Sequence, residues 1–266
     1  MTDELIWDVK KDRVTRELKE GKRIDGREKN EEREIEIEPN YIGRAEGSSM
    51  VKLGDTRVIA GVKTGIGSPF PDTPEEGVLM TNIELSPVAS PGFETGPPRE
   101  ETVEIARVVD RGIRESGMID TEKLCIEPGE KVWTVFIDIF PLDHDGNLID
   151  AAAIAAVNAL KNAELPVYDE EEEKINREET QGKLPTNDTP VAKTYAKIGD
   201  EIVLDPQLHE EKSQDARLTV YVNEEDNICA SQKGGKGAFK REEINNIIGK
   251  AVKKAPETRE KILEHS

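Results

Sequence analysis

The sequence predicts an α+β fold with mixed sheets and packed helices. Strand-like segments are followed by a helical segment twice along the 266-residue chain, an order typical of layered α+β domains. One strand, residues 131–142, is apolar on both faces, which predicts a position near the middle of a sheet that is covered on both sides. A chain of this length can bury roughly three-quarters of its unfolded surface, so a large core needs no disulfide.

The first elements follow from short periodic patterns. An amphipathic helix opens the chain, with apolar residues on or near one face: Leu5, Ile6, Val9, Val14 and Leu18. Alternating Glu and Ile predict a strand over 34–38. Strands 48–53 and 56–62 flank Gly54-Asp55, which predicts a two-residue hairpin turn with glycine first. Residues 78–85 form another strand, and the Pro- and Gly-rich segments 65–77 and 86–98 are long loops of the functional or mobile kind.

The middle of the chain predicts a helix over 100–116, a short strand over 124–126 and the long strand over 131–142. The long strand places Trp133, Val135, Ile137 and Ile139 on one face, and Val132, Phe136 and Phe140 on much of the other. A turn-rich loop over 143–150 then leads to an Ala-rich helix over 151–162. Asp150 occupies the expected N-cap position of that helix.

The last third begins with five consecutive acids, 169–173, which are expected to form a solvated surface excursion. Strand patterns then cover 191–198, 201–204, 216–222 and 228–231. The Gly-rich segment 233–237 lacks the Gly-Lys-Ser/Thr ending of a phosphate-binding P-loop, and we interpret it as a flexible turn. The chain ends in a helix with an apolar stripe of Ile244, Ile247, Ile248, Ala251 and Val252. No internal repeat is visible in the sequence.

The loop over 143–150 has the position of a phosphate site but not its chemistry. A strand that feeds a helix N-terminus through a Gly-containing loop points unpaired N–H groups and a helix dipole at that loop. Here the loop carries Leu148 and Ile149 with Asp150 at the helix start, and no Arg, Lys, Ser or Thr. A phosphate would meet a negative charge and two apolar side chains.

The composition is strongly acidic. Asp and Glu number 56 against 37 Lys and Arg, a net charge of −19, which argues against a general nucleic-acid binder. Two compatible interpretations remain. The acidic residues can form a solvated shell, as in proteins of a salty cytoplasm, or a few cationic residues can be concentrated at one site.

The three histidines show no metal-ligand spacing, and Cys125 and Cys229 are expected to be small buried hydrophobes. No membrane span or signal peptide is visible, so we expect a cytoplasmic protein.

Four segments carry a resemblance that covers the chain from about residue 5 to 255. They are 23–27, 47–60, 107–111 and 126–129, reading RIDGR, GSSMVKLGDTRVIA, RVVDR and IEPG. With the 130–165 region, they resemble the RNase PH family, and within it the non-catalytic subunits of the archaeal RNA exosome. The resemblance implies one RNase PH fold, like domain 2 of ribosomal protein S5, with two pseudo-repeated βαβα halves. Residues 1–266 would form this single domain, with a helical extension over about 1–22 and halves over about 23–165 and 185–255.

The resemblance also implies partners. Active relatives carry a Gly-Thr-Arg or Gly-Ser-Arg triplet in the 143–150 loop, which this chain lacks. It would therefore pair with a paralogous catalytic subunit, three such pairs closing a hexameric ring that carries RNA-binding cap subunits. Single-stranded RNA would be shortened from its 3′ end by phosphorolysis. Phosphate, and Mg²⁺ if the complex needs it, would act in the partner's active site, so no cofactor or metal ligand is expected in this chain.

The helix over 100–116 supplies the candidate RNA-binding residues. Its buried stripe is expected at Ala106, Val109 and Ile113, while Arg107, Arg111 and Arg114 align on another face. One interpretation is an ordinary solvent-exposed helix face, on which Glu104 pairs with Arg107 and Asp110 pairs with Arg114. The resemblance instead implies RNA contacts, first by Arg111, with Arg107 and Arg114 in support and Arg99 as a weaker candidate. Arginine suits this role because its planar fork binds phosphate oxygens in pairs.

The segment 205–215 bears on catalysis. By resemblance, active relatives place an Asp after a Glu-Glu pair here as general acid or metal ligand, but this chain has Lys212 in that place. No catalytic residue is therefore expected, although Asp205 and Asp215 remain as candidates. Two alternatives stay open: an active phosphate-dependent 3′-to-5′ exoribonuclease or nucleotidyltransferase in its own right, and an acidic scaffold with no RNA role.

Overall fold

The computed structural model describes residues 2–94 and 96–266, with only the backbone for residues 2–10. A six-stranded sheet forms the N-terminal half in the order β1-β2-β3-β6-β4, and β5 pairs with β6. Its strands are β1 (Ile35–Pro39), β2 (Gly47–Leu53), β3 (Thr56–Gly67), β4 (Val78–Ile83), β5 (Cys125–Glu127) and β6 (Lys131–Asp143). The accompanying helices are α1 (Thr2–Lys19), α2 (Glu100–Glu115), the short 3-10 helix η1 (Glu122–Leu124) and α3 (Leu148–Lys161).

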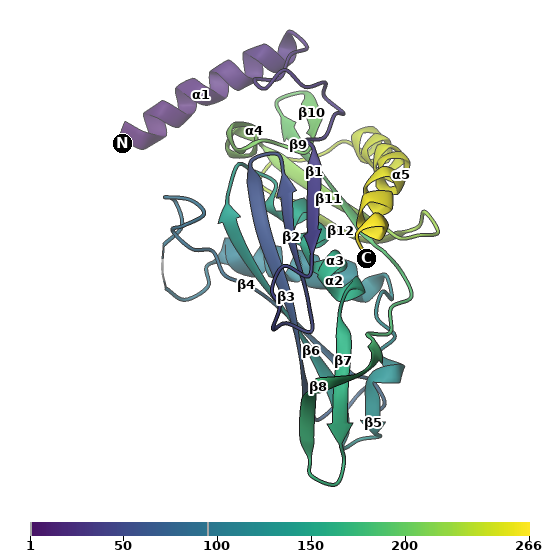
Figure 1. Ribbon diagram of the computed structural model, residues 1–266. Helices are drawn as coiled ribbons and strands as arrows, with labels where there is room; N and C mark the ends of the chain where they lie inside the picture. Colours follow the sequence, from purple (N-terminus) through teal and green to yellow (C-terminus); the bar gives the residue numbers. More distant parts are fainter. Residues whose placement is uncertain (1, 95) are drawn as a thin grey trace.

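A four-stranded antiparallel sheet in the order β10-β9-β11-β12 forms the C-terminal half. Its elements are β9 (Val191–Ile198), β10 (Glu201–Leu204), α4 (Leu208–Ser213), β11 (Ala216–Val222), β12 (Ile228–Gly234) and α5 (Arg241–Glu264). Between the halves, β7 (Glu164–Asp169) and β8 (Lys174–Lys183) form a two-stranded hairpin. The hairpin projects from one end of the molecule, and α1 lies at the other end (Figure 1).

The two halves share one hydrophobic core because α3 packs against both sheets. This helix contacts β2, β3 and β6 of the first sheet and β9 of the second, and α2 packs beside it (Figure 1). Alanine makes the approach close: Ala151, Ala155 and Ala159 are fully buried. Gly47 of β2 is required at this contact, since a Cβ there would lie 2.3 Å from the Ala159 carbonyl oxygen. The mixed α+β fold predicted from the sequence is confirmed.

The long strand β6 confirms one part of its prediction and corrects another. It lies inside the sheet, antiparallel to β3 and parallel to β4, and Val135, Ile137 and Ile139 are fully buried. Its second face is not covered along its whole length, because Phe140 is 42 % exposed. The sequence pattern showed the apolar residues on both faces but not that one face opens toward the end of the strand.

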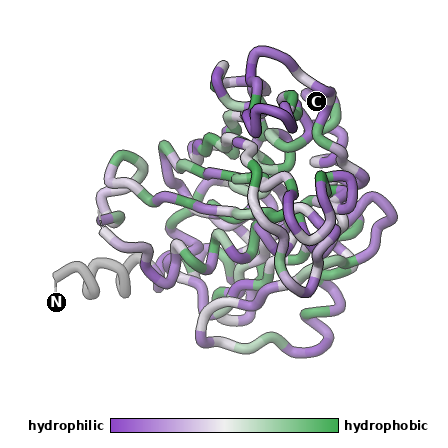
Figure 2. The backbone as a smooth tube through the Cα atoms, turned by 90° about the horizontal axis from the view of Figure 1, so that it is seen from below, coloured by the Kyte–Doolittle hydropathy of each residue, from purple (hydrophilic) through white to green (hydrophobic). Residues whose placement is uncertain are grey.

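The structure also tests the turns and loops that the sequence predicted. The hairpin turn is confirmed, with Leu53 opposite Thr56 and Gly54 at φ +57°. The loop expected over 65–77 begins later, because β3 continues to Gly67. The acidic run 169–173 is an exposed excursion at the tip of the β7–β8 hairpin. Helix α4 was not expected from the acidic segment 205–215. Figure 2 shows mostly hydrophilic residues in the outer loops.

The N-terminal helix is confirmed as a helix, and its C-terminal part packs against the second sheet. Val14 and Leu18 are buried with Ala196, Ile198 and Val203. The predicted apolar positions Leu5, Ile6 and Val9 lie outside the described side chains.

The two cysteines, Cys125 and Cys229, are free and half-buried. Cys229 packs against the main core, so the expectation of small buried hydrophobes is confirmed only in part. Within the described residues, no helix has the length and hydrophobicity to cross a bilayer.

Candidate functional site

Helix α3, which follows the turn after β6, begins earlier than the sequence indicated. Asn147, with φ +54°, is the N-cap of α3, so the prediction of Asp150 at this position is wrong. Asp150 lies in the first turn and is buried. Its carboxylate accepts hydrogen bonds from the Thr194 N–H at 3.0 Å and hydroxyl at 2.6 Å, and from Asn147 Nδ2 at 2.9 Å. Burial raises the pKa of Asp150 to about 6, against the lowering effect of these hydrogen bonds.

The chain's own carboxylates close this turn. The backbone N–H of Asn147 donates to Glu211 Oε2 at 2.5 Å, so an internal anion takes a position that a phosphate oxygen would use. Asp145 accepts a hydrogen bond from Gln207 Nε2 at 2.9 Å. The backbone of α4 presses against Gly146, where a Cβ would lie 2.5 Å from the Leu208 nitrogen. The turn therefore presents an acidic, filled surface.

A buried arginine ties the same turn to the segment after β10. Arg33 donates to the carbonyl oxygen of Asp145 at 2.8 Å and to both carboxylate oxygens of Asp205, at 2.7 and 2.9 Å. Arg27 adds a contact to Asp205 at 2.9 Å. Burial alone would raise the pKa of Asp205, but the hydrogen bond and charge of Arg33 outweigh it and lower that pKa to about 2. Asp205 thus serves as an internal counter-ion.

The second acidic candidate, Asp215, also has structural partners. Its carboxylate contacts Lys11 at 3.0 Å and accepts the Gly199 N–H at 2.7 Å. It therefore ties α1 and the β9–β10 turn to the start of β11. Lys212 lies exposed in α4.

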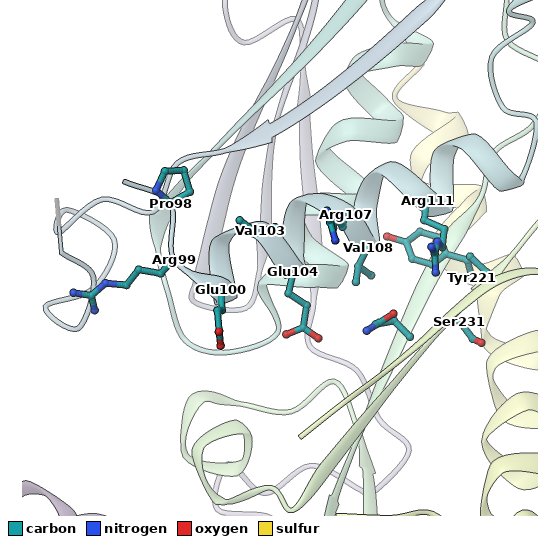
Figure 3. A pocket seen from close by; sticks show the side chains of 12 residues that line it. Pro98, Arg99, Glu100, Val103, Glu104, Arg107, Val108, Arg111, Tyr221 and Ser231 are labelled. Carbon is teal, nitrogen blue, oxygen red and sulfur yellow. The ribbon is translucent and has the colours of Figure 1, made fainter. Parts of the chain in front are cut away.

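The arginines of α2 lie in a different environment. Arg107 and Arg111 line an open groove of about 500 Å³ between α2 and strand β12, together with Arg99 just before the helix (Figure 3). Both arginines are exposed. The groove is completed by Pro98, Glu100, Val103, Glu104, Val108, Tyr221, Ala230, Ser231 and Gln232. The structure therefore brings three of the four predicted arginines to one surface.

Arg114 does not belong to this groove. Its guanidinium contacts Asp110 at 3.1 Å and the carbonyl oxygen of Leu79 at 3.3 Å, and it lines a separate hollow beside β4. The Asp110–Arg114 pair expected for a plain helix surface is therefore present. The expected pair of Glu104 with Arg107 is wrong, because Glu104 contacts Arg217 of β11 at 2.8 Å. Arg99 contacts Glu94.

The floor of the groove contains residues that the sequence did not single out. Tyr221 of β11 packs directly beneath α2, where Gly112 leaves room: a Cβ at that glycine would lie 2.1 Å from the tyrosine ring. Ser231 and Gln232 enter from β12. The buried stripe of α2 is Ile105, Val108, Val109, Gly112 and Ile113, so Val109 and Ile113 are confirmed, whereas Ala106 is only half-buried. Glycine within the apolar stripe was the one available signal of a close approach by an aromatic ring.

Comparison with known proteins places the chain in a family. The model of the 3′ exoribonuclease (RNase PH) family matches residues 31–166 with its domain 1 and residues 188–254 with its domain 2. The chain belongs to the RNase PH family.

Among its relatives, the exosome complex component Rrp42 of Thermococcus kodakarensis is 49 % identical over 98 % of this chain and 97 % of its own length. The corresponding component of Methanothermobacter thermautotrophicus is 51 % identical over 96 % of this chain and 94 % of its own length. A chain of the Archaeoglobus fulgidus exosome with RNA bound to the active site superposes with a TM-score of 0.90, at 46 % identity, covering 97 % of this chain and 99 % of that one.

Proposed function

We propose that this chain is a non-catalytic, RNA-binding subunit of the hexameric RNase PH-like ring of an archaeal exosome. In this role it supports 3′-to-5′ phosphorolysis of RNA that a paralogous subunit carries out. The identity of about 50 % to exosome components over the full length, and the superposition on exosome chains, support the assignment to the complex. The division of labour rests on the two sites described above.

The observation that carries the non-catalytic assignment is the filled turn ahead of α3. Phosphorolysis needs a bound phosphate that can attack the terminal phosphodiester, and anions bind at helix N-termini through free N–H groups and nearby cations. Here the N–H of Asn147 donates to Glu211, and Arg33 is committed to Asp205 and to backbone carbonyls. An incoming phosphate would have to displace an internal carboxylate and separate a buried ion pair.

The α2 groove supports the RNA-binding part of the proposal. Arg107 and Arg111 are exposed, in a chain whose net charge is −19, and they form a cationic strip beside apolar Val103 and Val108. Contacts of arginine with phosphate hold a strand in place without reading its sequence. Arg99 lies at the end of the strip but contacts Glu94 and points away from Arg107 and Arg111 in Figure 3, so it stays a weaker candidate. Arg114 is engaged with Asp110 and is assigned no primary role.

The remaining parts of the proposal follow from this assignment. The partners are the paralogous catalytic subunit, present as a trimer of heterodimers, single-stranded RNA, and RNA-binding cap subunits on the ring. Inorganic phosphate and any Mg²⁺ act in the paralogue's site, and this chain supplies no ligand to them. The location is the cytoplasm.

The test is RNA binding by rings assembled from this chain and its catalytic paralogue. Arg111→Glu places a negative charge in the strip, so binding of a single-stranded RNA should weaken at least tenfold and its phosphorolysis should slow. Arg114→Glu is the matched control on the same helix and should have a much smaller effect. The mass of the ring establishes that both variants assemble.

The result decides between the alternatives. Unchanged RNA binding by the Arg111→Glu ring would favour a scaffold with no RNA role. An equal loss in both variants would show that overall charge, rather than the groove, determines binding.

A further inference from the structure

The α2 groove carries two carboxylates that an RNA phosphate backbone would not select. Glu100, Glu104, Arg107 and Arg111 follow one another along a single face of α2 and all line the groove (Figure 3). A carboxylate beside a polyanion is repulsive unless the ligand offers it a hydrogen-bond donor. A groove built only to attract phosphate would therefore have no reason to position an acid among its arginines.

Glu104 is held in place, which distinguishes it from an ordinary exposed glutamate. Arg217 of β11 lies 2.8 Å from Glu104 Oε1, and its side chain is only 14 % exposed. Glu104 remains 35 % exposed, so part of its carboxylate faces the groove. The ion pair with a largely buried arginine keeps the acid near Arg217 and reduces its repulsion of a nearby phosphate.

A second observation indicates that the groove takes a ligand with hydrogen-bonding groups. Tyr221 is 1 % exposed, and its hydroxyl has no hydrogen-bond partner among the described residues. Figure 3 shows this hydroxyl pointing along the underside of α2 toward Arg107. A buried hydroxyl without a partner destabilises the fold, and a ligand oxygen in the groove would relieve this by accepting its hydrogen bond.

We propose that the groove holds one nucleotide of RNA, with Glu104 accepting a hydrogen bond from its ribose 2′-hydroxyl. Arg107 and Arg111 bind the adjoining phosphates, and Tyr221 donates to an oxygen of the same nucleotide. This inference rests on the RNA-binding function proposed above and adds a role in distinguishing RNA from DNA.

The ribose hydroxyl is the donor that fits a sequence-independent site. Amino groups of bases can also donate to a carboxylate, but they differ from base to base, whereas every ribonucleotide carries a 2′-hydroxyl. DNA lacks this donor, so Glu104 would only repel the phosphates of a DNA strand. A hydrogen bond to a charged acceptor is strong enough to make RNA bind about tenfold more tightly than DNA.

The experiment measures binding of assembled rings to three strands of one sequence: RNA, DNA and 2′-fluoro RNA, whose fluorine cannot donate. Phosphate is left out so that the strands stay intact. For the unaltered ring, RNA should bind best. In the Glu104→Met ring the preference for RNA over the other two strands should fall about tenfold, chiefly because DNA and 2′-fluoro RNA bind more tightly.

The matched control is Glu100→Met, one helical turn earlier on the same face. It removes the same charge without touching the pair with Arg217, so all three strands should gain affinity equally and the preference should persist. Tyr221→Phe should weaken all three strands alike. The mass of each ring establishes assembly.

The outcomes separate this inference from the function on which it rests. An unchanged preference in the Glu104→Met ring, with Arg111→Glu still weakening RNA binding, would overturn the 2′-hydroxyl assignment alone. A loss of preference in the Glu100→Met ring as large as in Glu104→Met would also overturn it. If Arg111→Glu has no effect on RNA binding, the RNA-binding function itself fails.

Discussion

The turn ahead of α3 and the groove along α2 are two places where this chain could hold an anion, and they differ in what their arginines do. At the turn, Arg33 is buried and bound to Asp205, and Glu211 takes up a helix N–H. At the groove, Arg107 and Arg111 are exposed and line an open space. One site is neutralised from within, and the other is available to a ligand.

The difference shows that a phosphate-site geometry is not enough for phosphate chemistry. The strand, turn and helix N-terminus are all present at the α3 turn, yet its charge requirement is met by the chain itself. Burial strengthens these internal interactions, because a charge removed from water depends on its partner. Arginines that stay in solvent keep their capacity for an external anion, at little cost to folding.

The largest expected effect comes from breaking the buried pair at the turn. Asp205→Asn removes the counter-ion of Arg33, whose side chain is 7 % exposed, and should lower the free energy of unfolding by about 3–5 kcal/mol. Asparagine tolerates the positive φ of +50° at this position, so backbone strain adds little. Denaturant-induced unfolding measures the change.

The control for this prediction is Asp110→Asn, which breaks the more exposed pair with Arg114 and should cost less than about 1 kcal/mol. Similar losses in the two variants would contradict the idea that the turn depends on a buried charge.

Asp150, in the same turn, should make the folded chain less stable as the pH rises. Its pKa of about 6 in the folded chain lies above the ordinary value of 3.8, so its stabilising contribution is complete below about pH 4 and is lost as pH rises through 6. Asp150→Asn does not titrate. The free energy of unfolding of the variant, relative to that of the unaltered chain, should therefore rise by up to about 3 kcal/mol between pH 4 and pH 7.

Unfolding free energies measured across this pH range for both proteins test the prediction. A constant difference would mean that Asp150 keeps the pKa of a solvated carboxylate. Asp205 behaves in the reverse sense, because its pKa of about 2 makes its contribution present above pH 3.8 and lost as pH falls toward 2.

The smallest expected effect concerns salt and sharpens the description of the groove. Each arginine that contacts a phosphate of a single strand adds about 0.7 to the slope of log affinity against log salt concentration. Arg107→Ala and Arg111→Ala rings should each lose about that much slope, whereas Arg114→Ala should lose almost none. A slope that changes equally in all three would show that Arg114 contacts RNA despite its pair with Asp110.

Local patterns predicted most of the fold, because they depend on periodicity. The alternation and apolar runs placed the strands of both sheets, and Gly54 marked a real hairpin. The N-cap of α3 was misplaced by three residues because Asn147 adopts a left-handed conformation and its side chain bonds to Asp150 and Asp205. Such a cap depends on partners distant in sequence, which local propensity does not contain.

The candidate site was predictable only in part for the same reason. Helical spacing correctly predicted that Arg107 and Arg111 share a surface but wrongly added Arg114 to it. It revealed neither the pairing of Glu104 with Arg217 nor the tyrosine beneath Gly112. The missing cations in the 143–150 loop were visible in the sequence, whereas Glu211 at the helix N-terminus was not. Contacts between α2 and β11, and between α3 and α4, arise only when the second sheet packs against the first half.

The most direct test of this account is phosphate-dependent shortening of single-stranded RNA by the purified chain without its paralogue. We expect no release of nucleoside diphosphates, because Glu211 already accepts the N–H of Asn147 and Arg33 is already bound to Asp205. Full activity is expected once the catalytic paralogue is present. Phosphate-dependent release by the lone chain that is abolished by Asp215→Ala would contradict the account.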